Sequence, residues 1–181
     1  MNDDRPQRRY RKHIRLPDYD YSSTGYYFVT LVTLGRALLF DDVRIRDTTE
    51  ASWLWLAKRY QHVELDYFVV MPNHLHGIIA LTGGASCGGS RAAATRGEKP
   101  LGQLIGAFKT VSTKEINRIR HTPGVAVWQL NYYERVIRNE RELDAIRQYI
   151  VDNPVKWALD PNNPRCPPRD QRPAGGSRAT A

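Results

Sequence analysis

Two histidines lie one residue apart in MPNHLHGIIAL (71–81), a stretch whose composition is otherwise that of a hydrophobic strand. In a strand, residues i and i+2 point to the same side, so His74 and His76 present both imidazoles on one face while Leu75 faces the other way. Two nitrogen donors can then converge on one metal ion without help from a loop. The same spacing also fits two partly exposed sheet histidines that bind nothing, so a metal site needs further ligands.

A second pair of functional side chains lies near the C-terminal end of the chain, in RQYIVDNPVKW (147–157). Tyr149 and Asn153 are four residues apart and therefore share one face of a helix. The tyrosine offers a reactive hydroxyl, and the asparagine offers a third metal ligand. Two simpler explanations stay open: Tyr149 as a half-buried aromatic beside the apolar stripe of that helix, and Asn153 as a C-terminal cap before Pro154.

The elements that must position these side chains follow from composition and spacing. The expected strands are 26–33, 63–71, 74–81 and 125–137, with a short extended return through 36–40. The expected helices are 52–61 after a polar start at 47–50, 101–119 with a possible break around Ser112 and Thr113, and a last helix from an Asn139 cap with Glu142 to a stop at Pro154. This order predicts an α+β fold: a ferredoxin-like antiparallel sheet with helices on one face, plus a C-terminal helix that carries Tyr149.

The 181 residues, 41% of them apolar, are enough for one domain with loose ends. We expect a basic arm at 1–16, a single domain at 17–159 with a flexible Gly-rich loop at 82–98, and a disordered Pro/Gly-rich tail at 160–181. Cys87 and Cys166 have no partner at metal-ligand spacing and indicate neither a disulfide framework nor a zinc site. No apolar run approaches the ~18 residues of a membrane span, so the expected location is the cytoplasm, without membrane attachment.

The charge balance favours a polyanionic partner. Lys and Arg outnumber Asp and Glu by 27 to 19, which gives a net charge of +8, and this excess most often means nucleic acid, although solubility alone also explains it. The candidate phosphate contacts are Arg8, Arg9, Arg11 and Lys12 in the arm, Lys109 and Lys114 on the second long helix, and Arg135 and Arg138 near the last helix. Tyr132 and Tyr133 compete with Tyr149 as nucleophiles, but on a strand one must point each way, and they more simply stack on bases or fill the core.

Three motifs together carry a family resemblance. VELDYFVVMPNHLHGII, LGQLIGAFKTVST and WQLNYYERVIRNERELDAIRQYIVDNPVKW, in this order and spacing, resemble the single-tyrosine transposases of the HUH (His-hydrophobic-His) superfamily, within them the group associated with repetitive extragenic palindromes (REP). The resemblance covers roughly residues 8 to 160. It implies a prokaryotic, nucleoid-associated enzyme that cleaves and rejoins single-stranded DNA at hairpin-bearing sites.

The resemblance also implies roles for the four residues. His74 and His76 would hold Mg²⁺ or Mn²⁺, Asn153 would be the third ligand, and Tyr149 would attack a backbone phosphate to form a 5′-phosphotyrosine. A phenol has a pKa of ~10, so forming the phenolate at neutral pH costs about 4 kcal/mol, which a nearby dication can lower. Related insertion-sequence enzymes are dimers that exchange the tyrosine helix, whereas the REP-associated group tends to be monomeric, and a monomer is expected here.

Two other classes of protein stay open. A ferredoxin-like sheet also serves as a non-catalytic nucleic-acid-binding platform through exposed strand aromatics, and YFVV and NYY would qualify. This alternative leaves the histidine pair and the Tyr149/Asn153 face unexplained. A structural zinc protein would ordinarily need four closed ligands, which the sequence does not offer.

Overall fold

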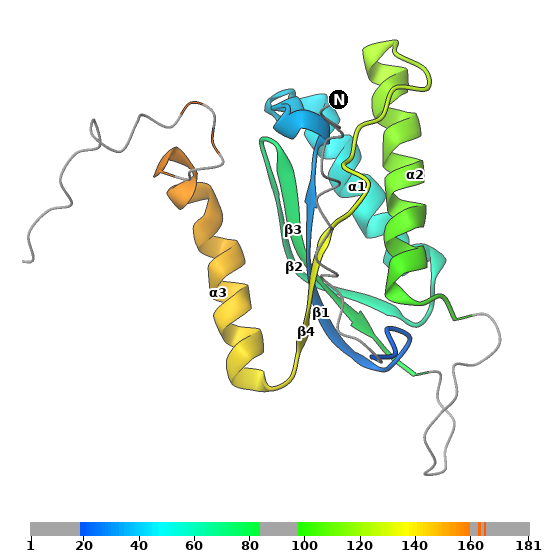
Figure 1. Cartoon of the computed structure of the whole chain (residues 1–181), viewed down its shortest axis with the longest axis vertical. Helices are drawn as coiled ribbons and strands as arrows, with labels where there is room; N and C mark the ends of the chain where they lie inside the picture. The colour runs from blue at the N-terminus through cyan, green and yellow to red at the C-terminus, as the bar shows by residue number, and fades with distance from the viewer. Residues whose placement is uncertain (1–18, 84–97, 160–162, 164, 166–181) are drawn as a thin grey trace, which may run out of the picture.

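The computed structural model describes residues 19–83, 98–159, 163 and 165 (Figure 1). The strands are β1 (Gly25–Val32), β2 (Val63–Met71), β3 (His74–Leu81) and β4 (Tyr133–Ile137). The helices are α1 (Val43–Arg59), α2 (Leu101–Arg120) and α3 (Glu140–Lys156), with short 3-10 turns at Leu34–Arg36, Leu39–Asp41 and Trp157–Leu159. The arm with Arg8, Arg9, Arg11 and Lys12, most of the loop and tail, and both cysteines lie outside the described residues.

The four strands form one antiparallel sheet in the order β2-β3-β1-β4. This order and the βαββαβ succession make the fold ferredoxin-like, as predicted. β1 and β3 are the central strands, and every residue of β3 is buried. The strand with the two histidines therefore lies in the middle of the sheet.

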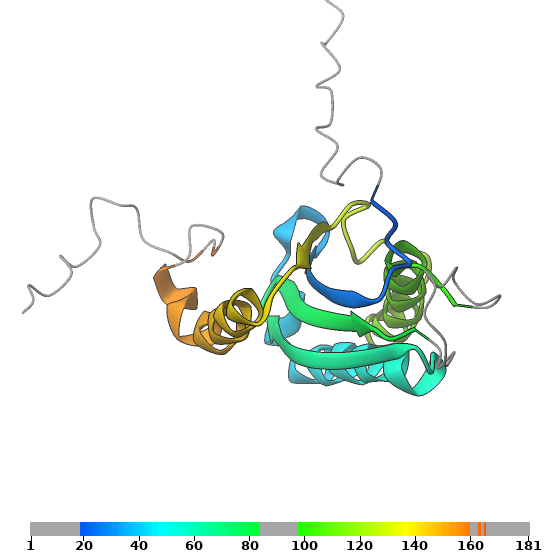
Figure 2. The same cartoon turned by 90° about the horizontal axis from the view of Figure 1, so that it is seen from below.

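The two faces of the sheet carry separate apolar clusters. On one face, Tyr27 and Leu31 of β1 pack with Trp53 of α1 and Phe108 of α2 in the main core. On the other face, a smaller cluster joins the sheet to α3; its buried members are Phe28, Ile78, Ile137, Leu143, Ile146 and Ile150. Figure 2 shows α1 and α2 on one side of the sheet and α3 on the other, so the predicted additional helix covers the opposite face.

Several predicted boundaries were wrong, each for a local physical reason. Two 3-10 turns, Leu34–Arg36 and Leu39–Asp41, replace the extended return predicted over 36–40, with Gly35 in the left-handed region (φ 62°). α1 begins earlier than predicted because the Asp42 side chain accepts from the Arg44 N–H and caps the helix. α2 has no break at Ser112, since its hydroxyl donates to the Phe108 carbonyl (2.7 Å) one turn earlier.

The last strand and the last helix also differ from the prediction. β4 is limited to 133–137 because 125–132 runs along α2 and meets the end of β1 through an isolated bridge between Thr33 and Trp128, with the Gln129 N–H donating to the Val32 carbonyl (2.9 Å). α3 begins as predicted, where the Asn139 side chain accepts from the Glu142 N–H (2.9 Å). It does not stop at Pro154, which lies within its last turn, where one lost backbone hydrogen bond is tolerated.

No helix in the described ranges is both long and apolar enough to cross a membrane.

Gly77 of β3 gives a test of how tightly the main core is packed. A Cβ at this position would lie 2.5 Å from Cζ2 of Trp53 and 3.3 Å from Cβ of Phe68, and Trp53 is fully buried. We expect Gly77→Ala to lower the free energy of unfolding by about 1–3 kcal/mol. Gly106→Ala is the matched control: a Cβ there meets nothing within 4 Å, so this substitution within α2 should raise stability by about 1 kcal/mol. Urea denaturation of both variants checks the pair, and two changes of the same sign would contradict it.

Candidate metal and tyrosine site

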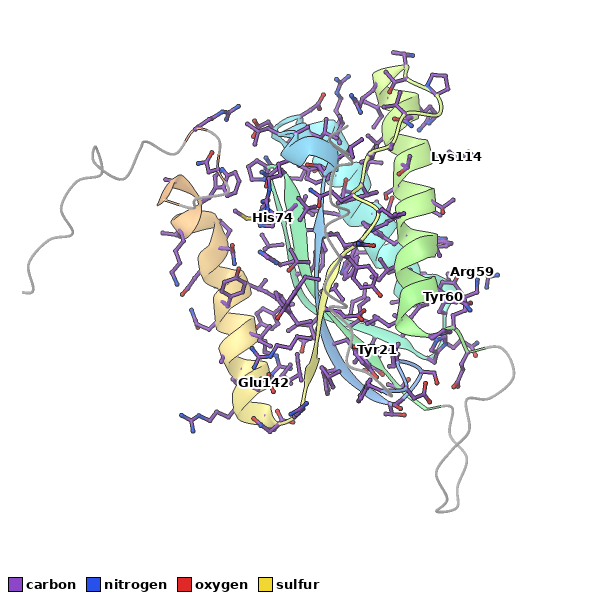
Figure 3. The ribbon with its side chains drawn as sticks, in the orientation of Figure 1. Tyr21, Arg59, Tyr60, His74, Lys114 and Glu142 are labelled. Carbon is purple, nitrogen blue, oxygen red and sulfur yellow. The ribbon has the colours of Figure 1, made fainter. Side chains whose placement is uncertain are left out.

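His74 and His76 converge at the start of β3 (Figure 3 labels His74). Side chains alternate along a strand. Leu75 and Gly77 face the main core, so His74 and His76 face α3. The two Nε2 atoms are 3.0 Å apart and the ring centroids 4.5 Å. Both residues are buried, with 5% and 6% of their surface exposed. The sequence-based expectation that the two imidazoles share one face is thus met.

The outer ring nitrogens of both histidines have polar partners that sequence reasoning missed. Nδ1 of His74 is 2.7 Å from Oδ1 of Asn73, and Nδ1 of His76 is 2.8 Å from Oγ1 of Thr30, its cross-strand neighbour on β1. The Asn73 amide nitrogen donates to the carbonyl of Arg36 (3.4 Å), which directs its oxygen to the imidazole.

These contacts define the tautomers. An amide oxygen only accepts, so Nδ1 of His74 carries a proton and its Nε2 keeps a free lone pair. That lone pair accepts from Nε2–H of His76, whose Nδ1 in turn accepts from the Thr30 hydroxyl. His74 is therefore already in the form that binds a metal, whereas His76 reaches it when the Thr30 hydroxyl rotates and accepts from Nδ1–H.

Burial, and to a smaller extent the neighbouring His74, lower the pKa of His76 from its ordinary value near 6.5 to about 3. A buried imidazolium would lose its hydration, so the neutral ring is strongly favoured. His76 consequently keeps an uncharged ring at neutral pH.

Tyr149 of α3 meets the histidine pair. Its hydroxyl is 3.4 Å from Nε2 of His76, and the two ring centroids are 5.3 Å apart. Phe28 contacts both partners: it stacks on His76 at 5.5 Å and meets Tyr149 edge-on at 6.0 Å. The tyrosine as a whole is 46% exposed, so a half-exposed side chain brings its hydroxyl to the buried imidazoles.

Asn153 and Trp157 extend the same helix face. Asn153 is buried, and its Nδ2 donates to the Tyr149 carbonyl (2.8 Å), which leaves Oδ1 available as a ligand. The Trp157 ring lies 5.6 Å from His74. Because Tyr149 adjoins His76 and Trp157 adjoins His74, Asn153 between them faces the pair. Asn153 is not a C-terminal cap, since α3 continues to Lys156; Trp157 was missed, although its four-residue spacing from Asn153 was a usable signal.

An ion pair fixes α3 against the edge strand. Arg147 donates from Nε and Nη2 to Oδ2 of Asp66 at 3.0 and 2.7 Å, and its guanidinium lies 5.8 Å from the centre of the Tyr67 ring. Asp66 and Tyr67 occupy the irregularity in the β2-β3 register between Leu65 and Phe68. A bulge of this kind re-aims side chains, and here it aims the carboxylate at the tyrosine helix.

The two Nε2 atoms are close enough to bind one ion together. Two donors at about 2.1 Å from one ion and at about 90° to each other are about 3.0 Å apart, and the two Nε2 atoms have this separation. Imidazole nitrogens suit zinc and copper, whereas an amide oxygen suits magnesium and manganese, so these donors alone do not choose the metal. The described residues contain no group of three or more His, Cys, Asp or Glu able to hold a metal. They thus provide two imidazoles and the amide of Asn153, and no four-ligand structural zinc site.

Tyr132 and Tyr133 point to opposite faces, as predicted. Tyr132 packs against the main core, below the ammonium of Lys109 (5.5 Å from the ring centre). Tyr133 is 46% exposed and meets Phe28 edge-on at 6.3 Å, on the α3 face. Tyr133 is therefore near the histidines, and Tyr132 is not.

The candidate phosphate contacts fall into two groups. Arg135 and Arg138 lie by the start of α3, where Arg135 forms an ion pair with Glu142 (2.6 Å) and the Arg138 N–H donates to the same carboxylate (3.0 Å). Lys109 and Lys114 lie on α2, across the sheet from α3 (Figure 3). Lys109 donates to the carbonyls of 129, 130 and 131, and burial lowers its pKa to about 8. Its first role is therefore to hold this loop, whereas Lys114 is exposed.

α3 covers part of the sheet that an aromatic platform would expose: Phe28 packs under this helix, and Phe68 packs against the main core. A nucleic-acid-binding sheet of the platform type needs strand aromatics exposed to stack on bases. Tyr67 of β2 and Tyr133 of β4 are exposed in this way, 49% and 46%. The non-catalytic alternative therefore stays open on this geometry, but it leaves the histidine pair and Tyr149 unexplained.

Comparison with known proteins gives a fold and a family. No family model matches the chain. An uncharacterized protein of Haemophilus influenzae is 32% identical over 167 residues, which cover 83% of this chain and 92% of that protein. The solved structure of a REP-associated tyrosine transposase bound to a REP hairpin has a TM-score of 0.55 and 21% identity, over 78% of this chain and 73% of that one. A proposed transposase of Deinococcus radiodurans has a TM-score of 0.44 and 17% identity, over 76% of this chain and 95% of that one.

The chain thus has the α+β fold of a REP-associated tyrosine transposase, in agreement with the resemblance drawn from its motifs. It belongs to the same protein family as the Haemophilus influenzae protein.

The burial of His76 predicts a pH dependence of folding. The unfolded chain takes up a proton below pH ~6.5, whereas the folded chain does not until about pH 3, so stability is full above pH ~6.5 and falls as the pH drops through this window, by at most ~1.4 kcal/mol per pH unit. His76→Gln should reduce this slope. Urea denaturation of both proteins between pH 7 and 4 measures it, and equal slopes would contradict the neutral buried imidazole.

Proposed function

We propose that the protein is a metal-dependent single-stranded DNA endonuclease and strand transferase of the transposase class, which acts at hairpin-bearing sites. The observation that carries this proposal is the meeting of the Tyr149 hydroxyl with His76 at 3.4 Å, beside a second imidazole whose Nε2 is 3.0 Å away. A nucleophile and two metal-ligating nitrogens, supplied by α3 and β3, suit phosphoryl transfer better than structural packing.

In this proposal, His74, His76 and Oδ1 of Asn153 hold Mg²⁺ or Mn²⁺. The bound ion would polarise the scissile phosphate and lower the cost of forming the phenolate. Thr30 and Asn73 orient the two imidazoles through their outer nitrogens.

Tyr149 is the nucleophile. Its oxygen attacks the phosphorus, the bond from phosphorus to the 3′ oxygen breaks, and the departing strand leaves as a 3′-hydroxyl. The half-exposed phenol can pass its proton to solvent. The 5′-phosphotyrosine that forms preserves the phosphodiester bond energy, so a different 3′-hydroxyl can reverse the step and join another strand without ATP.

A single chain can supply the whole site. α3 packs on its own sheet through Ile146 and Ile150, and the Arg147–Asp66 ion pair holds it there. These contacts support a monomer that needs no exchanged helix. Hairpin DNA is the proposed partner, by analogy with the fold relative solved with a REP hairpin. Tyr133 is a base-stacking candidate beside the site, and Arg135, Arg138 and the arm residues Arg8, Arg9, Arg11 and Lys12 are phosphate contacts.

The nucleophile can be tested with hairpin oligonucleotides taken from the flanks of the gene. With Mn²⁺, the protein should form a covalent adduct with the 3′-side fragment, and EDTA should prevent it. Tyr149→Phe should abolish the adduct because it removes the attacking oxygen, whereas Tyr133→Phe should retain it. Denaturing gels with 5′- and 3′-labelled strands give the measurement. An adduct that survives in Tyr149→Phe, or hairpin binding with no cleavage by the unaltered protein, would overturn the proposal.

The orienting role of Thr30 can be tested by metal binding without DNA. Thr30→Val removes the hydroxyl at Nδ1 of His76 and should weaken Mn²⁺ binding by about 10- to 100-fold, the usual cost of losing such a partner. Thr110→Val is the matched control, since the Thr110 hydroxyl donates only to the Gly106 carbonyl on α2. Calorimetric titration with Mn²⁺ measures both variants. Equal affinities would remove Thr30 from the site.

A further inference from the structure

A hollow lies on α2, across the sheet from the tyrosine helix. The chain returns along α2 after its C-terminal end, and Figure 1 shows this yellow-green segment beside the helix. The cavity between helix and segment is about 890 Å³ and is lined by residues from Lys109 to Arg118 and from His121 to Leu130. We refer to it as the α2 groove.

Three side chains fasten the returning segment to α2. Nε1 of Trp128 donates to Oγ of Ser112 (2.9 Å), and Nδ2 of Asn117 donates to the Val125 carbonyl (2.7 Å). Lys109 holds the carbonyls of 129–131. The α2 groove is thus preformed, so a ligand does not have to order it on binding.

The lining combines cations with exposed apolar side chains. Lys114, Arg118 and His121 contribute basic groups, and none of the described lining residues is Asp or Glu. Arg118 is also paired with Glu115 outside the lining (3.0 Å). Leu130 is 81% exposed and Val125 is 45% exposed. Cations that track phosphates are one feature of single-stranded nucleic-acid grooves, and in the α2 groove exposed aliphatic side chains stand where such grooves usually have aromatic rings for the bases.

The Leu34–Arg36 turn lies between the α2 groove and the histidine pair at one end of the sheet. Asn73, which contacts His74, donates to the Arg36 carbonyl, and the Leu34 N–H donates to the Val127 carbonyl (2.7 Å). Leu34 is 53% exposed and Arg36 is also exposed. Figure 3 shows His74 and Lys114 on opposite sides of the sheet, both toward its upper end. We call this exposed turn the Leu34–Arg36 ridge. A DNA strand that crosses it from the histidine pair to the α2 groove passes one cation, Arg36.

We propose that the α2 groove binds single-stranded DNA that leaves the proposed active site across the Leu34–Arg36 ridge. The inference rests on the proposed function, because it takes the DNA from that site. Phosphates contact Arg36 and Lys114, and bases pack on Leu34, Leu130 and Val125. The hairpin substrate is thereby recognised together with its unpaired flank.

The test compares hairpins whose single-stranded overhangs are about 4 or about 16 nucleotides long, the range of known groove site sizes, on either the 5′ or the 3′ side. Fluorescence anisotropy with the full chain measures their affinities. The long overhang on one side should bind more tightly, and both Lys114→Glu and Leu130→Ser should remove this gain, roughly 5-fold or more, while the short overhang is unaffected. Lys58→Glu, an exposed cation on α1, is the charge-matched control and should retain the gain.

The remaining outcomes separate the groove from the proposed activity. An adduct at Tyr149 with no effect of overhang length, or variants that weaken the short and long overhangs equally, overturns the groove and leaves the activity intact. An overhang gain that depends on Lys114 and Leu130, without any adduct, supports the groove and overturns the activity. Binding of a poly-glutamate peptide that Leu130→Ser abolishes, with no overhang gain, assigns the groove to an acidic protein partner and overturns the inference.

Discussion

The alternation of side chains along β3 is the constraint on which the rest of the structure depends. It places His74 and His76 on one face of a buried central strand and leaves Gly77 on the other, against Trp53. Buried imidazoles are stable only when neutral and hydrogen-bonded. Thr30 and Asn73 meet this need, so the same contacts that make the histidines tolerable in the sheet also aim their Nε2 atoms at one point.

The packing on the two faces of the sheet positions different parts of the candidate site. The main core, with α1 and α2, fixes the strands and therefore the histidines. The smaller cluster under α3, together with the Arg147–Asp66 pair, brings Tyr149 to them. The Tyr149 hydroxyl and the imidazole nitrogens proposed to hold the metal are thus fixed by packing on opposite faces of one sheet, and β1 contributes to both clusters through Tyr27 and Phe28.

The sequence was sufficient for the fold class, the hairpin of β2 and β3, and the shared face of the two histidines, because period-two patterns and turn residues are local signals. It was not sufficient for Thr30, whose contact with His76 depends on strand register across 46 residues. The length of β4 could not be predicted from the sequence either, since 125–132 has the composition of a strand but is bound to α2 by tertiary hydrogen bonds. Pro154 led to a wrong helix end because α3 continues past it to Lys156, although a proline cannot donate a hydrogen bond to the carbonyl four residues earlier.

Because α3 is attached to the sheet separately from α1 and α2, the site stays assembled only as long as α3 remains docked. Local opening of an element needs only the free energy of its own contacts, which is smaller than that of global unfolding. For α3 these contacts are mainly the small cluster around Ile146 and Ile150 and two ion pairs that are partly open to solvent, Arg147–Asp66 and Arg135–Glu142. Hydrogen exchange in α3 therefore occurs at a lower free energy than in β1 and β3, and each such opening separates Tyr149 from the histidines while the main core stays folded.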